Sequence, residues 1–152
     1  MSYQVYESGV LPASISTVWP LVSQFDGSPK WSAVVEESTI ENSVNPQTIG
    51  SIRCLKIRGV STPAREELIA LDQINHTFTY KLLQAGGAFA ELQNYTATIK
   101  VSEITLTNQT FFEWSVRFNC PAERSEDLTQ IVHSAYRGGI QSLIEHLESP
   151  KQ

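Results

Sequence analysis

The chain has 152 residues, which is the size of one domain, so residues 1–152 are expected to fold around a single hydrophobic core. Hydrophobic residues make up 41% of the sequence and charged residues 18%, a composition that excludes a disordered or membrane-embedded protein. The net charge is −5 and the 11 basic residues are not clustered, so no binding to nucleic acid is expected.

The sequence also indicates a compartment. No apolar run approaches the roughly 20 residues that cross a bilayer, so no transmembrane segment is expected. Residues 1–9 lack the positive charge and the apolar block of a signal peptide, and we expect a cytoplasmic protein. Cys54 and Cys120 stand far apart without a partner motif and are expected to be reduced, buried thiols.

The chain is predicted to begin with a strand and two short helical pieces. Residues 3–10 mix aromatic, β-branched and polar side chains, as strands do. Ser14 or Ser16 is the candidate cap of the first helical piece, and Pro20 costs that helix a hydrogen bond or holds it to its first turns. A break at residues 27–29 separates these pieces from the strand-like part of the chain.

Further strand-like segments then succeed one another, each bounded by turn residues. They cover residues 33–41, 50–58, 64–73, 76–84, 92–104 and 110–119. The connections are too short for crossover helices, so consecutive strands are expected to pair antiparallel. The predicted fold class is α+β with a seven-stranded curved antiparallel sheet.

Residues 125–148 are predicted to form one long helix. Apolar side chains recur there with a 3-1-3-1 spacing that places them in one stripe along a helix. Ser125 is the candidate N-cap and Pro150 the candidate stop. Because such a stripe needs an apolar partner, we expect the helix to lie against the sheet.

The order of these elements, and the residues that mark it, resemble the START / birch-pollen-allergen-like superfamily (SRPBCC), which includes polyketide cyclase/dehydrase and lipid-transport proteins. The matching marks are PASISTVW at 12–19, Phe25, Trp31, GSIR at 50–53, Glu66, Glu67, Leu68, Asp72, Tyr80, Asn94, Tyr95, Glu113, Trp114, YRGGI at 136–140 and Leu143. The resemblance implies a helix-grip fold, in which the curved sheet wraps around the C-terminal helix and a cavity lies between them.

The superfamily also includes the plant abscisic-acid receptors, whose two mobile loops close over the hormone. Residues 59–63 and 86–92 lie where those loops would be. Because residues 89–92 lack the basic pair of the receptors, hormone reception is not expected.

Three signals indicate which residues line the cavity: the resemblance, the apolar alternation of the last strand and the apolar stripe of the long helix. The predicted ligand-binding residues are Trp31, Arg53, Leu55, Ile57, Glu66, Leu68, Tyr80, Leu82, Tyr95, Trp114, Val132, Tyr136, Gly139 and Ile140. If Arg53 and Glu66 both point inward they can pair across neighbouring strands, because an isolated buried charge is costly; the alternative is a solvated pair on the outer face.

Two further choices remain open at this point. The family could place Glu113 inside, whereas the apolar alternation through Phe112, Trp114 and Val116 favours Trp114 on the cavity side. Glycines at 138 and 139 weaken the helix, which indicates either close packing on the sheet or room for a ligand. Buried tyrosines at 80, 95 and 136 would give the cavity a hydrogen-bonding floor.

These features favour a protein that binds or transports a small hydrophobic molecule, such as a lipid, an isoprenoid or a polyketide-like compound. One alternative is a polyketide-type cyclase/aromatase or dehydratase in which Arg53, Glu66 and a tyrosine move protons. Another is a module that binds a protein partner. No histidine cluster has metal-ligand spacing and no nucleophile motif is present, so neither a metal, a cofactor nor a catalytic residue is assigned. A monomer or weak homodimer is expected.

Overall fold

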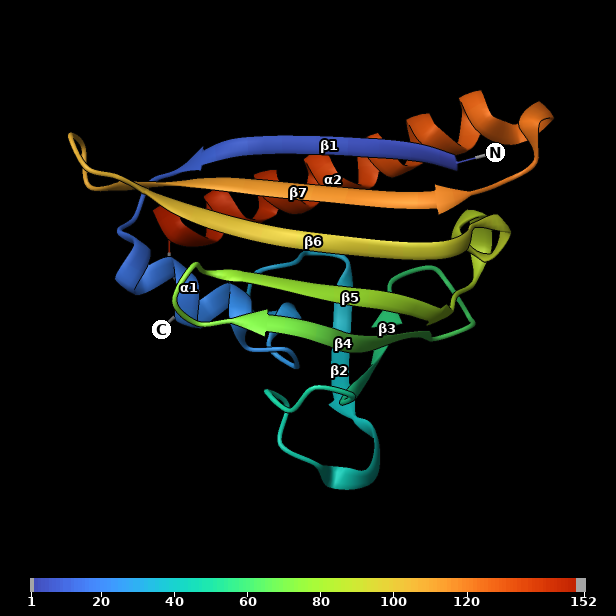
Figure 1. The fold of residues 1–152 in the computed structure, drawn as a ribbon, viewed down its shortest axis with the longest axis horizontal. Coiled ribbons are helices and arrows are strands. Elements are labelled where there is room, and N and C mark those ends of the chain that lie inside the picture. Colours follow the sequence, from blue (N-terminus) through green and yellow to red (C-terminus); the bar gives the residue numbers. More distant parts are fainter. Residues whose placement is uncertain (1, 150–152) are drawn as a thin grey trace.

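A curved sheet with one long helix lying against it forms the body of the molecule (Figure 1). The computed structural model describes residues 2–149. The sheet has seven strands and is antiparallel throughout, and the long helix crosses it obliquely. The predicted helix-grip α+β class is therefore confirmed.

The strands follow the turn pattern of the sequence closely. They are β1 (Ser2–Leu11), β2 (Val35–Ile40), β3 (Ile52–Ile57), β4 (Ala64–Asp72), β5 (Thr77–Gln84), β6 (Gln93–Ile104) and β7 (Gln109–Asn119). Their order across the sheet is β1-β7-β6-β5-β4-β3-β2, so β2 to β7 form a meander and β1 pairs with the last strand. Register shifts between β4 and β5, and between β2 and β3, accompany the bend of this half of the sheet.

The expected helical pieces after β1 are α1 (Ile15–Ser23) and the 3-10 turn η1 (Ser28–Lys30). Ser14 holds the N-cap position of α1 in an extended conformation, but its hydroxyl caps no backbone N–H and instead contacts the Ser16 hydroxyl. The helix continues past Pro20 and buries Trp19 and Val22 against the sheet. A third short turn, η2 (Glu41–Ser43), follows β2.

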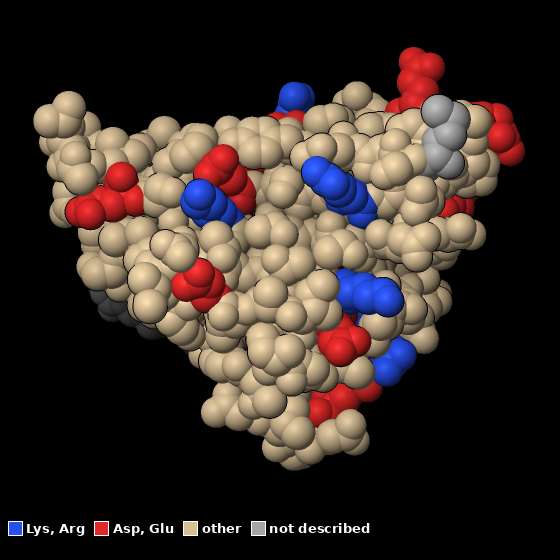
Figure 2. All heavy atoms as spheres, in the orientation of Figure 1, with Lys and Arg blue, Asp and Glu red and all other residues tan. Residues whose placement is uncertain are grey.

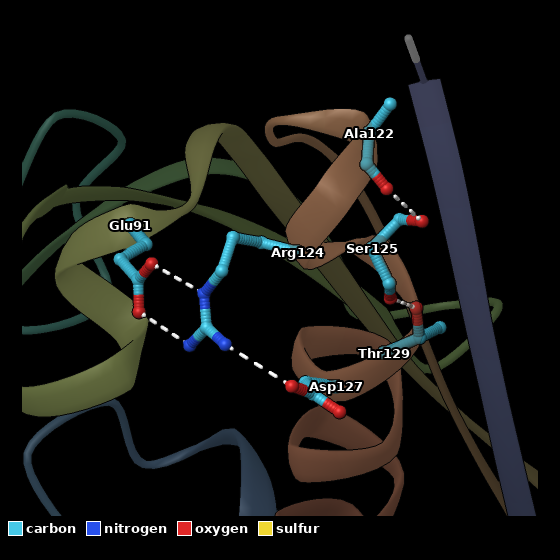
Figure 3. Close-up of polar contacts among 6 residues, drawn as sticks. All are labelled: Glu91, Ala122, Arg124, Ser125, Asp127 and Thr129. Atoms are coloured by element: carbon cyan, nitrogen blue, oxygen red, sulfur yellow. Dashed lines mark hydrogen bonds and ion pairs between the residues drawn. The ribbon is translucent and has the colours of Figure 1, made fainter.

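The long helix α2 (Ser125–Glu148) has the predicted bounds, but its N-terminus differs from the prediction. The 3-10 turn η4 (Ala122–Arg124) leads straight into α2, so Ser125 already has helical backbone angles. Its hydroxyl donates to the carbonyl of Ala122 at 2.8 Å and does not cap the helix (Figure 3). The prediction of Ser125 as N-cap was wrong for this reason, and Pro150 lies outside the described residues.

The core lies between α2 and the concave face of the sheet. Its largest fully buried side chains include Phe25, Phe78, Phe112, Phe118 and Tyr80. The helix approaches β1 so closely that a Cβ atom on Gly9 would lie 2.9 Å from Cγ2 of Ile140. A glycine at this place in β1 therefore allows the first strand and the last helix to meet.

Candidate functional site

A cavity of about 210 Å³ lies between the bent half of the sheet and the middle of α2. Most of the predicted site residues line it: Trp31, Arg53, Leu55, Ile57, Glu66, Tyr80, Leu82, Tyr95, Trp114, Tyr136 and Gly139. Val34, which is 54% exposed, also contributes to the lining, so one end of the cavity reaches the surface. Whether these residues bind a ligand stays a prediction.

Leu68, Val132 and Ile140 lie in the core and not at the cavity, contrary to their predicted place. All three are buried, and Ile140 points toward Gly9 of β1. On α2 the cavity is lined by Ala135, Tyr136 and Gly139. The cavity thus borders one edge of the apolar stripe, and the opposite edge packs on β1.

Arg53 and Glu66 form a buried ion pair at the cavity wall. They lie opposite each other on β3 and β4, and the guanidinium contacts Oε1 of Glu66 through Nε at 2.8 Å and Nη2 at 2.7 Å. Nη1 of Arg53 also donates to the carbonyl of Phe25 and to the Ser28 hydroxyl. The guanidinium lies over the rings of Phe25 and Tyr80, 4.2 and 4.9 Å from their centroids. The predicted inward pairing is confirmed.

The hydroxyls of Tyr80, Tyr95 and Tyr136 form a hydrogen-bonded floor. The hydroxyls of Tyr95 and Tyr136 are hydrogen-bonded to each other, and the Trp114 indole N–H donates to the Tyr80 hydroxyl at 3.0 Å. Burial raises the pKa of Tyr95 and Tyr136 well above the ordinary tyrosine value, and burial together with the nearby Glu66 carboxylate raises the pKa of Tyr80. The three phenols are therefore held in the neutral form.

Trp114, not Glu113, faces the cavity. Its ring stacks on Tyr136, with centroids 4.1 Å apart, and meets Trp31 edge-on. Glu113 points to the other face of β7 and accepts a hydrogen bond from Tyr6 on the neighbouring strand. The apolar alternation of β7 thus predicted the correct orientation.

Gly139 allows the stacked rings to approach the helix. A Cβ atom there would lie 2.8 Å from Cζ3 of Trp114, whereas a Cβ atom on Gly138 would meet nothing within 4 Å. Close packing therefore accounts for Gly139, although this residue also borders the cavity. A larger side chain at 139 would displace Trp114 before it filled empty space.

Several lining residues that the prediction left out come from two loops. Val60 and Thr62 follow β3, and Gly86 and Phe89 follow β5. The family resemblance points to the loop positions 59–63 and 86–92, but side-chain direction in loops follows no period. That resemblance was the available signal.

An ion pair joins the second loop to the turn η4 that precedes α2 (Figure 3). Glu91 ends the 3-10 turn η3 (Gly87–Glu91), and its two oxygens accept from Nε and Nη2 of Arg124 at 2.9 and 3.0 Å. Arg124 also reaches Asp127 in the first turn of α2. These contacts fix the turn that carries Phe89 beside Tyr95 at the cavity.

Other kinds of site receive no support from the part of the chain that the structure describes. No group of three or more His, Cys, Asp or Glu side chains in residues 2–149 is arranged to hold a metal ion. Within the same residues, no helix is long and apolar enough to cross a membrane. On the face shown in Figure 2, acidic and basic side chains are interspersed and large areas carry neither.

Residues 3–148 match the family described as polyketide cyclase / dehydrase and lipid transport. The chain belongs to this family. A comparison with curated proteins returned no match. The family and its fold support a role in binding a small hydrophobic ligand.

Solved structures show the same fold across most of the chain. An uncharacterised protein from Bacillus thuringiensis is 25% identical, with a TM-score of 0.84 over 97% of this chain and 100% of that one. A protein from Nitrosospira multiformis is 20% identical, with a TM-score of 0.80 over 97% of each chain. Major latex-like protein 151 from Panax ginseng is 15% identical, with a TM-score of 0.76 over 95% of this chain and 97% of that one.

Proposed function

We propose that the protein binds or transports a small hydrophobic molecule, which it holds in the cavity between the sheet and α2. The observation that carries the proposal is the cavity itself, which has apolar and aromatic walls with a few polar groups converging on it. The neutral tyrosines support binding rather than proton abstraction, because a phenol with a raised pKa donates hydrogen bonds and is a poor base at neutral pH.

Binding can be tested with one ring compound and one chain compound. Purified protein is titrated by calorimetry with 2-naphthol and, separately, with palmitate, and a native mass spectrum of freshly purified protein reports any ligand carried from the cell. We expect at least one compound to bind with one-to-one stoichiometry. If neither compound binds and the mass spectrum shows only the bare chain, the proposal is wrong.

A matched pair of variants locates the binding site. Leu82 lines the cavity, whereas its neighbour Leu83 is 39% exposed and does not. Leu82→Trp should fill the cavity and abolish binding, while Leu83→Trp should leave the affinity unchanged. Equal affinity in both variants, with both folded, would place any binding elsewhere.

A further inference from the structure

We infer that the ligand is a small, uncharged, planar compound of one or two rings that donates a hydrogen bond from a hydroxyl or N–H group to Glu66. The inference rests on the proposed function and deepens it. A ligand of this kind is smaller than the long-chain lipids and the larger polyketides that the family description covers.

Cavity volume limits the size of the ligand. Pockets for drug-sized molecules span about 300–1,000 Å³, whereas an apolar cavity of about 150 Å³ holds benzene. The cavity here measures about 210 Å³. One or two fused rings fit this space, while a fatty acyl chain or a four-ring system is too large to be enclosed by it.

The walls favour a flat ring. Trp31 and Trp114 meet edge-on with centroids 6.2 Å apart, and Phe89 and Tyr95 are tilted at 6.0 Å. All four of these side chains line the cavity. Aromatic rings prefer offset-stacked or edge-to-face neighbours, so a planar aromatic ligand can extend this arrangement where a flexible chain cannot.

The charge of the lining favours an uncharged ligand. Arg53 and Glu66 are the only charged residues among the described residues that line the cavity, and they neutralise each other. A ligand carboxylate would compete with Glu66 for Arg53, and a ligand cation would compete with Arg53 for Glu66. Either charge would be desolvated without a free partner, which is costly.

The Oε2 oxygen of Glu66 can accept a hydrogen bond from a ligand. The hydrogen bond from Nε of Arg53 and the shortest ion-pair contact, from Nη2, both go to Oε1, and no hydrogen bond within residues 2–149 reaches Oε2. Among the described residues, Nε1 of Trp31 and Oγ of Ser38 are the side-chain atoms that are fully buried and have no hydrogen-bond partner. Oε2 of Glu66 is not one of them, so this oxygen is accessible. Glu66 is 8% exposed and lines the cavity, where Oε2 can be reached.

In protein cavities, water commonly satisfies polar groups that have no protein partner. A ligand group that displaces this water without replacing its hydrogen bond loses affinity. A hydrogen bond to a charged acceptor adds about 1.5–3 kcal/mol, which corresponds to roughly 10–100-fold in affinity. A hydroxyl or N–H group on the ring is therefore expected to raise the affinity at least about tenfold.

The test compares 2-naphthol with ligands that lack its donor, carry a negative charge or are larger. Unaltered protein is titrated by calorimetry with 2-naphthol, with 2-methoxynaphthalene, which lacks the donor, with 2-naphthoate, which is anionic, and with palmitate and 1-hydroxypyrene, which are larger. We expect 2-naphthol to bind at least about tenfold tighter than each of the others. Equal binding of 2-naphthol and 2-methoxynaphthalene, or tighter binding of palmitate or 1-hydroxypyrene, would overturn the inference and leave the proposed function standing. If none of them binds and the native mass spectrum shows only the bare chain, both the inference and the proposed function are overturned.

A variant of Glu66 provides a second readout. Glu66→Gln leaves the charge of Arg53 without its carboxylate partner, so the variant should bind 2-naphthoate at least about tenfold tighter than the parent does and should lose its preference for 2-naphthol. An unchanged ranking of the ligands in folded Glu66→Gln would contradict the role of Glu66. If the variant does not fold, the ligand series on the parent protein decides.

Discussion

Two adjacent glycines in α2 have opposite surroundings, and this difference gives a prediction at the scale of single residues. A Cβ atom on Gly138 meets nothing, so Gly138→Ala should raise the free energy of unfolding by about 0.5–1 kcal/mol through helix propensity alone. Gly139→Ala should forgo this gain or destabilise the protein, because Trp114 must leave its stacked position on Tyr136. Denaturant unfolding measures both changes, and tryptophan fluorescence should shift for Gly139→Ala alone. Equal stabilisation by both would refute the close contact.

The same stretch shows what residue patterns reveal and what they leave undetermined. The stripe on α2 identified the buried positions, yet it did not separate Gly139 at the cavity from Ile140 against β1. The two positions are adjacent in sequence and lie about 100° apart around the helix, so both fall within a broad apolar face. The position at which β1 packs on α2 determines which edge of the apolar stripe faces the cavity.

The alternation of side chains along a strand was more informative than the helix stripe, because with a period of two each side chain points to one face of the sheet or to the other. Alternation through β7 placed Trp114 inward and Glu113 outward, as the structure has them. In β4 alternation alone does not decide the face, since both sets of alternating residues contain apolar side chains. There the ion pair of Glu66 with Arg53 marks the inner face.

At the scale of elements, Glu7 links β1 to α2 and makes their contact sensitive to acid. Nδ1 of His133 lies 2.5 Å from Oε2 of Glu7, and Nε of Arg137 lies 3.0 Å from the same oxygen. Burial alone would raise the pKa of Glu7, but the hydrogen bonds and charges of these two partners outweigh it and lower the pKa below 4.5. The carboxylate is therefore more acidic in the folded chain than in the unfolded one.

This lowered pKa sets the direction of a pH dependence. The stabilisation is fully present above the pKa of the unfolded chain, near 4.5, and is lost as the pH falls through the lower folded-state value. Glu7→Gln should therefore be less stable than the parent at pH 7 and should lose less stability on acidification below about pH 4.5. Unfolding curves across this range, with Glu36→Gln as a control at an exposed position, measure the difference. Parallel pH profiles for the parent and Glu7→Gln would contradict the assignment.

The loop side chains at the cavity could not be predicted from the sequence. Strand and helix bounds agree with the structure to within a few residues, because turn residues and periodicity determine them. The predicted strand at 33–41 is observed as Val35–Ile40, for example. Val60, Thr62, Gly86 and Phe89 reach the cavity through loop conformations that no period encodes. A packing contact between Gly86 and the Val60–Thr62 segment brings the two loops together.

At the scale of the whole molecule, the first strand and the last helix complete one continuous core. β1 pairs with β7 at the edge of the sheet and packs against α2, so both ends of the described chain belong to the same unit. Within residues 2–149, buried apolar side chains from the sheet, α1 and α2 form one cluster. Unfolding is therefore expected to be a single cooperative transition.

Leu143 is the position at which to test this expectation, since it is fully buried in α2 whereas its neighbour Ile144 is only partly buried. Leu143→Ala should lower the free energy of unfolding by about 2–5 kcal/mol, because it removes buried methyl groups and leaves a void. Ile144→Ala should cost less, because part of its side chain already contacts solvent.

Far-ultraviolet circular dichroism reports on the sheet and helix, while fluorescence reports on Trp19, Trp31 and Trp114 in three different segments. The two signals should share one midpoint in the parent and one lower midpoint in Leu143→Ala. Separate midpoints, or a loss below about 0.5 kcal/mol for Leu143→Ala, would mean that α2 is not an integral part of the core.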